Sequence, residues 1–391
     1  MPFSGLRYLI LQRMLLLNIL VFTLIGGYVL LILYFLAGWL RLKEFEPGQK
    51  MPTTKVTVVV PVRNESHNIL NLLNNLKEQR YNKNLFEVIV VDDHSTDNTL
   101  QLIRNFQMPN LRVIALSDDP ELALVNRVNK KIGIEKAVRE ATGELIMTTD
   151  ADCHPGSNWI FTTVAYYEQH KPVMIAGMVS YFHDTSFVGK FQTLDFLSLV
   201  GIAAASIQNG FYNLCNGANL AYTKSAFIEV DGFRQIDHIP SGDDMMLMHK
   251  MAKKYGDKIA YLKNKDAIVY TSTEKDFVAF WNQRVRWTSK STHYEDKRIT
   301  AILAFVYLMN LLIVLNLAIG LFFPPMLKLA MWMFLAKLCI DTLFTYAVTK
   351  FFRRENLLWL FLPVQAVHVL YIILIAPAGV FGKYNWKGRR V

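Results

Sequence analysis

The sequence predicts an α/β domain with a mostly parallel sheet, flanked on both sides by transmembrane α-helices. Between residues 51 and 298, β-branched runs alternate with amphipathic helical patterns, as expected of repeated strand–helix units. Long apolar stretches without charge lie before and after this region. Acidic clusters follow two of the expected strands, at the edge where parallel sheets bind their ligands.

The amino-terminal region, residues 1–50, is predicted to be a membrane anchor. Residues 14–40 contain no charged side chain and exceed the roughly 20 residues that cross a bilayer. A secretory signal peptide would have an apolar core of about 7–15 residues followed by a cleavage site of small residues, and neither fits here. We therefore expect a spanning helix that stays attached.

The carboxy-terminal region, residues 299–391, is predicted to be a membrane bundle with a basic tail. Its apolar segments cover residues 302–323, 329–352 and 357–381, whereas residues 51–298 show no such stretch. Three complete spans would carry the basic tail across the membrane. Because Pro363 and Pro377 allow the last segment to be re-entrant, the number of spans stays open.

The basic charge of the chain is confined to these flanking regions. The whole chain carries +10, from 42 Lys and Arg against 32 Asp and Glu. Residues 1–50 hold five basic and two acidic side chains, residues 299–391 hold nine and two, and the middle region is neutral. A neutral domain argues against nucleic acid as a partner. Basic residues beside the apolar segments predict a multi-pass membrane protein whose middle domain is cytosolic.

The middle region, residues 51–298, reads as alternating strands and helices. Val56–Val60 is a β-branched run that Pro61 is expected to end, and Ser66 is a suitable N-cap for the helical stripe after it. Further strands are expected over residues 88–91, 112–116 and 145–149, and helices over residues 69–76 and 130–141. The continuous apolar strands favour a parallel sheet buried on both faces.

Two acidic clusters follow the strands of this region. Asp150 and Asp152 lie one residue apart, a spacing that lets two carboxylates bind one hard divalent cation together with substrate phosphates. The other cluster, residues 92–97, follows the strand over residues 88–91. Each cluster could equally be an ordinary turn, because Asp, Ser and Thr also cap helices and bond to their own backbone.

Seven short motifs in order make the chain resemble the family 2 glycosyltransferases, inverting enzymes of GT-A fold that use nucleotide-sugar donors. The motifs are Pro61-Val62-Arg63-Asn64-Glu65, residues 91–97, Asn129-Lys130-Lys131, Asp150-Ala151-Asp152, residues 216–219, Gly242-Asp243-Asp244 and Gln283-Arg284-Val285-Arg286-Trp287. The last motif, Gln-x-x-Arg-Trp, is similar to that of membrane-embedded members that make polysaccharides or glycosylate ceramide. Motifs of this type cover the whole middle domain.

The resemblance implies a role for each matching residue. Asp244, with Asp243 beside it, would supply the general base, and which of the two acts stays open. The implied donor-binding residues are Pro61, Arg63, Glu65, Asp92, Asp93, Lys130, Asp150, Ala151 and Asp152. Asp150 and Asp152 would also hold Mg²⁺ or Mn²⁺. The implied acceptor and diphosphate residues are Gly217, Asn219, Gln283, Arg286 and Trp287.

The expected activity is transfer of a sugar from a nucleotide-diphosphate sugar, a UDP-sugar first, to a lipid-linked or saccharide acceptor at the bilayer, in the inner membrane of a bacterium. A processive polysaccharide synthase is the alternative within the class. Two alternatives belong to other classes of protein: a membrane-anchored nucleotidyltransferase, and a transporter or scaffold that uses Lys337 and Asp341. Gln283, Arg286 and Trp287 could also belong to a basic aromatic helix lying on anionic lipid.

Overall fold

The computed structural model describes residues 3–119, 130–237, 239, 242–382, 385–386 and 389–390. It divides into two compact units, one made of residues 1–37 and 281–383 and the other of residues 38–280 and 384–391. Asn129 and the tail residues Lys383 and Lys387 lie outside the described residues. The predicted division at residues 50 and 298 remains a prediction.

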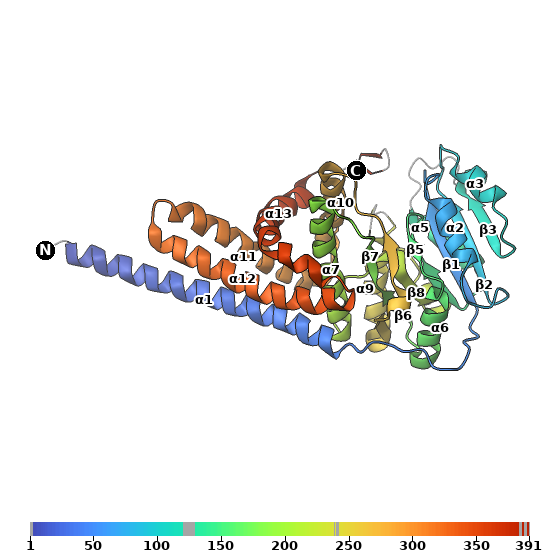
Figure 1. Ribbon diagram of the computed structural model, residues 1–391, viewed down its shortest axis with the longest axis horizontal. Helices are drawn as coiled ribbons and strands as arrows, with labels where there is room; N and C mark the ends of the chain where they lie inside the picture. Colours follow the sequence, from blue (N-terminus) through green and yellow to red (C-terminus); the bar gives the residue numbers. More distant parts are fainter. Residues whose placement is uncertain are drawn as a thin grey trace. The chain divides into compact units, whose positions relative to one another are not determined.

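The larger unit is built on a central sheet (Figure 1). Within the described residues the sheet has seven strands in the order β3-β2-β1-β4-β8-β6-β9. The strands are β1 Val56–Val62, β2 Phe86–Asp92, β3 Leu111–Ala115, β4 Leu145–Thr148, β6 Met174–Gly177, β8 Leu220–Thr223 and β9 Ile259–Leu262. Neighbours pair in parallel except at β8, which runs antiparallel to both β4 and β6. The predicted α/β class with a mostly parallel sheet is therefore confirmed.

Helices and a small second sheet surround the central one. The helices are α2 Ile69–Lys77, α3 Thr99–Asn105, α5 Lys130–Glu140, α6 Trp159–His170, α7 Phe187–Gln208, α8 Lys224–Glu229 and α9 Asp243–Tyr255. Helix α5 contacts β1 and β2, and α9 contacts β9. The second sheet, β5-β10-β7, joins His154–Pro155, Val269–Thr271 and Val179–Tyr181. This arrangement brings the ends of β1, β4 and β8 together with the first turns of α5 and α9.

Pro61 does not end its strand, contrary to the sequence prediction. Strand β1 continues to Val62, and Pro61 is in register with Val91 of β2. The backbone N–H and C=O groups of the odd-numbered residues of β1 face β4, since the carbonyl of Val59 accepts from the backbone N–H of Thr149. Because β4 ends at Thr148, no ladder partner is lost where proline lacks its N–H. The predicted cap also moves: α2 has Asn68, and not Ser66, at its N-cap.

Helix α7 is a long apolar helix inside the larger unit, although the sequence predicts no membrane-length stretch between residues 51 and 298. It covers 22 residues, and its mean hydropathy of 1.3 makes it one of four helices long and apolar enough to cross a membrane. However, 67% of that stretch is buried, and the helix contacts β7 and β9. Burial against the two sheets gives α7 a core role in this unit.

The smaller unit consists of helices. Along the chain these are α1 Phe3–Arg41 up to residue 37, the end of α10 Phe277–Thr288, α11 Lys297–Gly320, α12 Pro324–Phe351 and α13 Phe361–Phe381. Residues 14–41, 297–320 and 355–381 are long and apolar enough to cross a membrane. Helix α12 is not among the candidate spans found in the described residues. These features are compatible with a membrane protein.

A polar cluster joins α1, α12 and α13 inside the smaller unit. Asp341 accepts hydrogen bonds from Lys337 at 2.5 Å, from Gln365 at 2.6 Å and from the Tyr28 hydroxyl at 2.9 and 3.1 Å. Lys337 also donates to the Tyr28 hydroxyl at 2.9 Å and is only 1% exposed. The four side chains therefore form one satisfied network, and we refer to them as the helix-bundle cluster.

The last turn of α1 belongs to the larger unit, where it makes specific contacts. The Lys263 ammonium lies 4.0 Å from the ring centroid of Trp39 and donates to the carbonyls of Trp39 and Leu42, at 3.3 and 3.1 Å. Arg41 donates to the side chain of Asn209 at 2.6 Å. A Cβ atom on Gly38 would lie 2.6 Å from the carbonyl oxygen of Ala205, so only glycine permits this close approach.

Candidate active site

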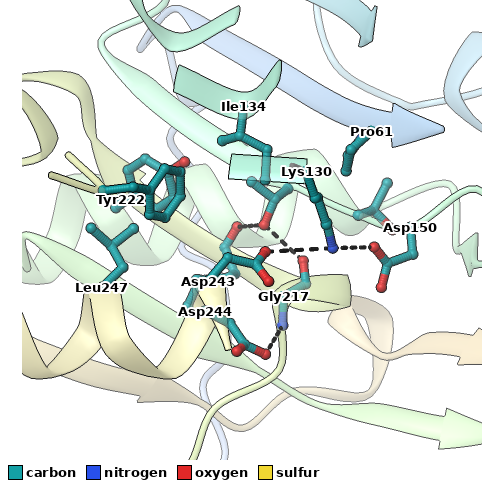
Figure 2. Close-up of a pocket in the computed structure, with 13 residues that line it drawn as sticks. Pro61, Lys130, Ile134, Asp150, Gly217, Tyr222, Asp243, Asp244 and Leu247 are labelled. Atoms are coloured by element: carbon teal, nitrogen blue, oxygen red, sulfur yellow. Dashed lines mark hydrogen bonds and ion pairs between the residues drawn. The ribbon is translucent and has the colours of Figure 1, made fainter. Parts of the chain in front are cut away.

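A pocket in the larger unit gathers the polar residues at the strand ends (Figure 2). Its walls come from β1, the end of β4, β8 and the first turns of α5 and α9. The lining residues are Pro61, Lys130, Ile134, Thr148, Thr149, Asp150, Gly217, Leu220, Tyr222, Phe233, Asp243, Asp244 and Leu247. Six of the predicted site residues, from five different motifs, therefore line one pocket.

Lys130 connects the two acidic sides of this pocket. Its ammonium lies 2.8 Å from an oxygen of Asp150 and 3.5 Å from an oxygen of Asp243. Burial by itself would lower the pKa of Lys130, but the carboxylates of Asp150, Asp243 and Asp244 outweigh it and raise the pKa above its ordinary value. Lys130 is therefore a permanent cation between the predicted donor side and the predicted catalytic pair.

Asp243 and Asp244 are the first residues of α9. Gly242 occupies the N-cap position with φ at +85°, a left-handed conformation that favours glycine, and directs the helix into the pocket. One oxygen of Asp244 accepts from the backbone N–H of Gly217 at 3.0 Å, and the other accepts from that of Met245 at 2.8 Å. Both carboxylates benefit from the positive end of the helix dipole.

Four of the predicted donor-binding residues, Arg63, Glu65, Asp92 and Asp93, lie at or just after the ends of β1 and β2. The guanidinium of Arg63 donates to the carbonyl of Asp93 at 2.8 Å and lies 3.6 Å from its carboxylate. Asp92 is 1% exposed and accepts from the N–H of Ser95 at 3.1 Å. Glu65 accepts from the amide of Asn68 at 2.8 Å at the start of α2. None of these four residues lines the pocket described above.

The carboxylates of Asp150 and Asp152 suit a hard divalent cation. Asp152 is exposed, and Ala151 between them is buried. Among the residues that the structure describes, no group of three or more His, Cys, Asp or Glu side chains is placed to hold a metal. Magnesium commonly takes one or two carboxylates and completes its shell with water and substrate phosphates, so the pair fits a metal that binds with its substrate.

The predicted acceptor-side residues Gly217 and Asn219 differ in what they offer. Gly217 lines the pocket, where its carbonyl accepts from Thr148 at 2.7 Å. Asn219 is 4% exposed, and its amide group bonds to Trp159, Met178 and Ala267 at 2.7–2.9 Å. The side chain of Asn219 therefore supports the loop that presents Gly217.

Gln283, Arg286 and Trp287 lie on α10, in the smaller unit. Between them, Arg284 is 2% exposed, and its guanidinium carbon lies 4.2 Å from the ring centroid of Trp287. Arg284 also donates to the side chain of Gln283 at 3.1 Å. Arg284 thus connects two residues of the motif, a role that the spacing of the motif does not reveal.

Pocket residues outside the motifs could not be found from the sequence. Thr148 holds the Gly217 carbonyl, and Ile134, Leu220, Tyr222, Phe233 and Leu247 form an apolar wall. They carry no spacing signal, since their shared location follows from the antiparallel placement of β8 and from the packing of α5 and α9.

A sheet of this topology with acidic strand ends places the chain among the α/β enzymes that bind nucleotides at strand ends. The model described as Glycosyl transferase family 2 matches residues 57–230, and the model described as Glycosyl transferase family group 2 matches residues 145–374. The second match covers more than half of the chain. The chain belongs to the family 2 glycosyltransferases and is a glycosyltransferase, which removes the nucleotidyltransferase and scaffold alternatives.

Two curated relatives are similar to this chain. A poly-β-1,6-N-acetyl-D-glucosamine synthase of Staphylococcus aureus is 26% identical over 235 residues, which cover 59% of this chain and 53% of the relative. The glycosyltransferase AglE of Haloferax volcanii is 26% identical over 201 residues, covering 49% of this chain and 59% of the relative. The chain thus spans a little over half the length of each.

A solved structure shares the fold. The mannosyltransferase PcManGT from Pyrobaculum calidifontis, in complex with GDP-Man and Mn²⁺, superposes with a TM-score of 0.53. At 20% sequence identity the alignment covers 92% of this chain and 98% of that one. The fold is therefore GT-A, as the sequence predicts.

Proposed function

We propose that this chain is an inverting, metal-dependent glycosyltransferase that moves a sugar from a nucleotide-diphosphate sugar to a lipid-linked or saccharide acceptor at a membrane. One observation carries the proposal: the Lys130 ammonium lies between Asp150 and Asp243, 2.8 and 3.5 Å from their oxygens, with Asp244 beside them in the same pocket. A carboxylate that can bind a metal, a cation that can bind phosphate and a carboxylate that can act as a base therefore line the same pocket.

Asp244 is the proposed general base. Asp243 is paired with Lys130, and the two oxygens of Asp244 accept from the backbone N–H groups of Gly217 and Met245 at the start of α9. Asp244 takes the proton of the acceptor hydroxyl while that oxygen forms its bond to the anomeric carbon. The bond from this carbon to the diphosphate oxygen breaks in the same displacement, so the configuration inverts.

The donor diphosphate is proposed to lie near Asp150, Asp152 and Lys130. Asp150 and Asp152 would hold Mg²⁺ or Mn²⁺, which would neutralise the charge that develops on the leaving diphosphate. The Mn²⁺ named with the mannosyltransferase PcManGT supports a divalent metal in this fold. Lys130 adds a fixed positive charge, and Arg63, Glu65, Asp92 and Asp93 are proposed to bind the nucleoside, with UDP expected first.

The acceptor is proposed to arrive from the membrane. Apolar helices of membrane length lie on both sides of the α/β domain in the sequence, and the basic residues beside them favour a multi-pass protein with a cytosolic catalytic domain. In this proposal Gln283 and Arg286 contact the diphosphate and Trp287 offers an aromatic face to the acceptor. The motif order supports these roles.

The test compares purified Asp244→Asn, Asp243→Asn and Asp152→Asn variants with the wild type, using radiolabelled UDP- and GDP-sugars and membrane lipids as acceptor. Loss of the base should lower kcat by about 10²–10⁴-fold in Asp244→Asn while donor affinity stays unchanged. Asp257→Asn, at an exposed position outside the pocket, serves as the matched control. Full transfer by folded Asp244→Asn and Asp152→Asn would refute the proposal.

A processive polysaccharide synthase is the second candidate, favoured by the similarity to the poly-β-1,6-N-acetyl-D-glucosamine synthase. The two candidates differ in product length. A ladder of long chains on a sizing gel supports the synthase, and a single added sugar on a lipid supports one-step transfer.

A further inference from the structure

Lys131 is a buried cation that the proposed chemistry does not use. It lies in the first turn of α5, directly after Lys130, and is 1% exposed. Its ammonium donates to the backbone carbonyls of Ile236 at 2.5 Å and of Ile239 at 2.7 Å. A buried ammonium costs free energy that an apolar side chain of similar size would avoid. The two bonds are therefore what distinguishes a lysine from a methionine at this position.

The two carbonyls belong to the segment that leads into the proposed catalytic pair. This segment, residues 230–242, connects α8 with α9, and we call it the α8–α9 segment. It is folded locally at the two residues that Lys131 contacts, because the N–H of Ile239 donates to the carbonyl of Ile236 at 3.3 Å. Gly242 ends the segment and is the N-cap of α9. The position of the segment therefore sets where α9 begins.

Lys131 is carried by a helix that packs closely on the central sheet. A Cβ atom on Gly133 of α5 would lie 2.8 Å from a methyl group of Val91 in β2. Lys130 of the same turn pairs with Asp243, the first residue of α9, at 3.5 Å (Figure 2). The first turn of α5 thus holds the start of α9 in two ways, through the carboxylate of Asp243 and through the carbonyls of the α8–α9 segment.

We propose that Lys131 is a positioning residue for Asp244, the proposed general base. By holding the carbonyls of Ile236 and Ile239, it fixes the start of α9. The Asp244 carboxylate then lies where it accepts from the N–H of Gly217, at 3.0 Å. Without the ammonium the two carbonyls lose this partner, and the segment shifts toward water or another donor. This inference rests on the proposed function, because Lys131 takes no part in the proton transfer itself.

The experiment separates the position of the base from donor binding. The full-length Lys131→Met variant is purified in detergent, its affinity for UDP and for GDP with Mn²⁺ is measured calorimetrically, and kcat is measured with radiolabelled UDP- and GDP-sugars. We expect kcat to fall about 10–100-fold, because a misplacement of about 1 Å at a reacting group can cost about 10²-fold. The nucleotide affinity should stay within about twofold of the wild type. Lys131→Arg keeps a cation that can donate to both carbonyls and should recover most of kcat.

Lys224→Met is the matched control for a merely structural effect. Lys224 also donates to two backbone carbonyls, those of Arg139 at 3.0 Å and Ala141 at 2.7 Å. These carbonyls lie at the other end of α5, and Lys224 does not line the active-site pocket. This variant should lower the unfolding temperature, as Lys131→Met does, but leave kcat unchanged.

Two results overturn the inference: wild-type kcat in Lys131→Met, or an equal loss of kcat in Lys224→Met. If Lys131→Met does not fold, Lys131→Gln is assayed in its place, because its side chain keeps an N–H donor but is shorter and uncharged. The same loss of kcat is then expected. A wild type that transfers no sugar refutes the proposed function and the inference with it, whereas an active wild type beside a fully active variant refutes the inference alone.

Discussion

Replacing Lys337 by methionine should destabilise the protein by about 2–4 kcal/mol, because it leaves the Asp341 carboxylate without its cation. The side chain of Asp341 is only 14% exposed, and Lys337 contributes a bond of 2.5 Å. Removing one partner of a buried pair costs about 3–5 kcal/mol, and the bonds that remain from Tyr28 and Gln365 soften this loss. The helix-bundle cluster thus predicts a large loss of stability from a substitution that lies outside all seven sequence motifs.

The double variant Lys337→Met with Asp341→Leu should recover much of this loss. With both charges removed, only the Tyr28 hydroxyl and the Gln365 amide lose a partner, at about 1 kcal/mol each. The double variant is then more stable than the sum of the single variants predicts, by at least about 2 kcal/mol. This coupling energy separates a satisfied network from independent contacts.

The measurement is equilibrium unfolding in detergent micelles, followed by tryptophan fluorescence, for the wild type and the three variants. Lys328→Met, at an exposed position of the same helix, is the matched control and should change the free energy of unfolding by less than about 0.5 kcal/mol. A loss below about 1 kcal/mol in Lys337→Met, or strict additivity in the double variant, would refute the reasoning.

Four further outcomes are expected. Lys131→Met should lower the stability of the larger unit by about 1–3 kcal/mol in chemical unfolding, because Lys131 is 1% exposed and donates to the carbonyls of Ile236 and Ile239 at 2.5 and 2.7 Å. Gly177→Ala should lower the unfolding temperature, since its Cβ would lie 2.4 Å from the side chain of Asn219. Hydrogen bonds from Thr99 and Ser66 lower the pKa of Asp97 to about 2, although burial by itself would raise it. The Asp97 carboxylate therefore stabilises the fold above pH 3.8, and this stabilisation is lost as the pH falls toward 2. Asp97→Asn should accordingly reduce the pH dependence of the free energy of unfolding between pH 3.8 and 2. Chelation by EDTA should abolish sugar transfer, and excess Mn²⁺ should restore it in the radiolabel assay.

The meeting of distant motifs in one pocket is predictable from the sequence. Asp150 follows a strand of the sheet, and Lys130 is the first residue of a helix that packs on the same sheet. Asp243 lies 93 residues after Asp150 in the sequence. The carboxyl ends of parallel strands share one edge, so residues placed there come together regardless of their separation along the chain. The rule needs only the strand pattern, which the β-branched runs make clear.

The apolar wall of the pocket and the role of α7 as a core helix could not be predicted from the sequence. Tyr222 reaches the pocket because β8 enters the sheet antiparallel between β4 and β6, and its short sequence does not specify a direction. Helix α7 has the length and hydropathy of a span, and only its burial against β7 and β9 identifies it as a core helix. Pro61 stays within β1 because β4 ends early, a property of the neighbouring strand.

The contact between Trp39 and Lys263 has a consequence for the order in which this protein folds. A helix leaves its last carbonyls without partners inside the helix, and in the last turn of α1 the carbonyl of Trp39 accepts from an ammonium 224 residues further along the chain. Helix α1 is synthesised before the α/β domain, but the bond to its last turn can form only after the strand β9 has been synthesised. A nascent chain that stops before residue 263 therefore has its first helix formed and its capping lysine still untranslated, which couples completion of the amino-terminal helix to synthesis of almost the whole α/β domain.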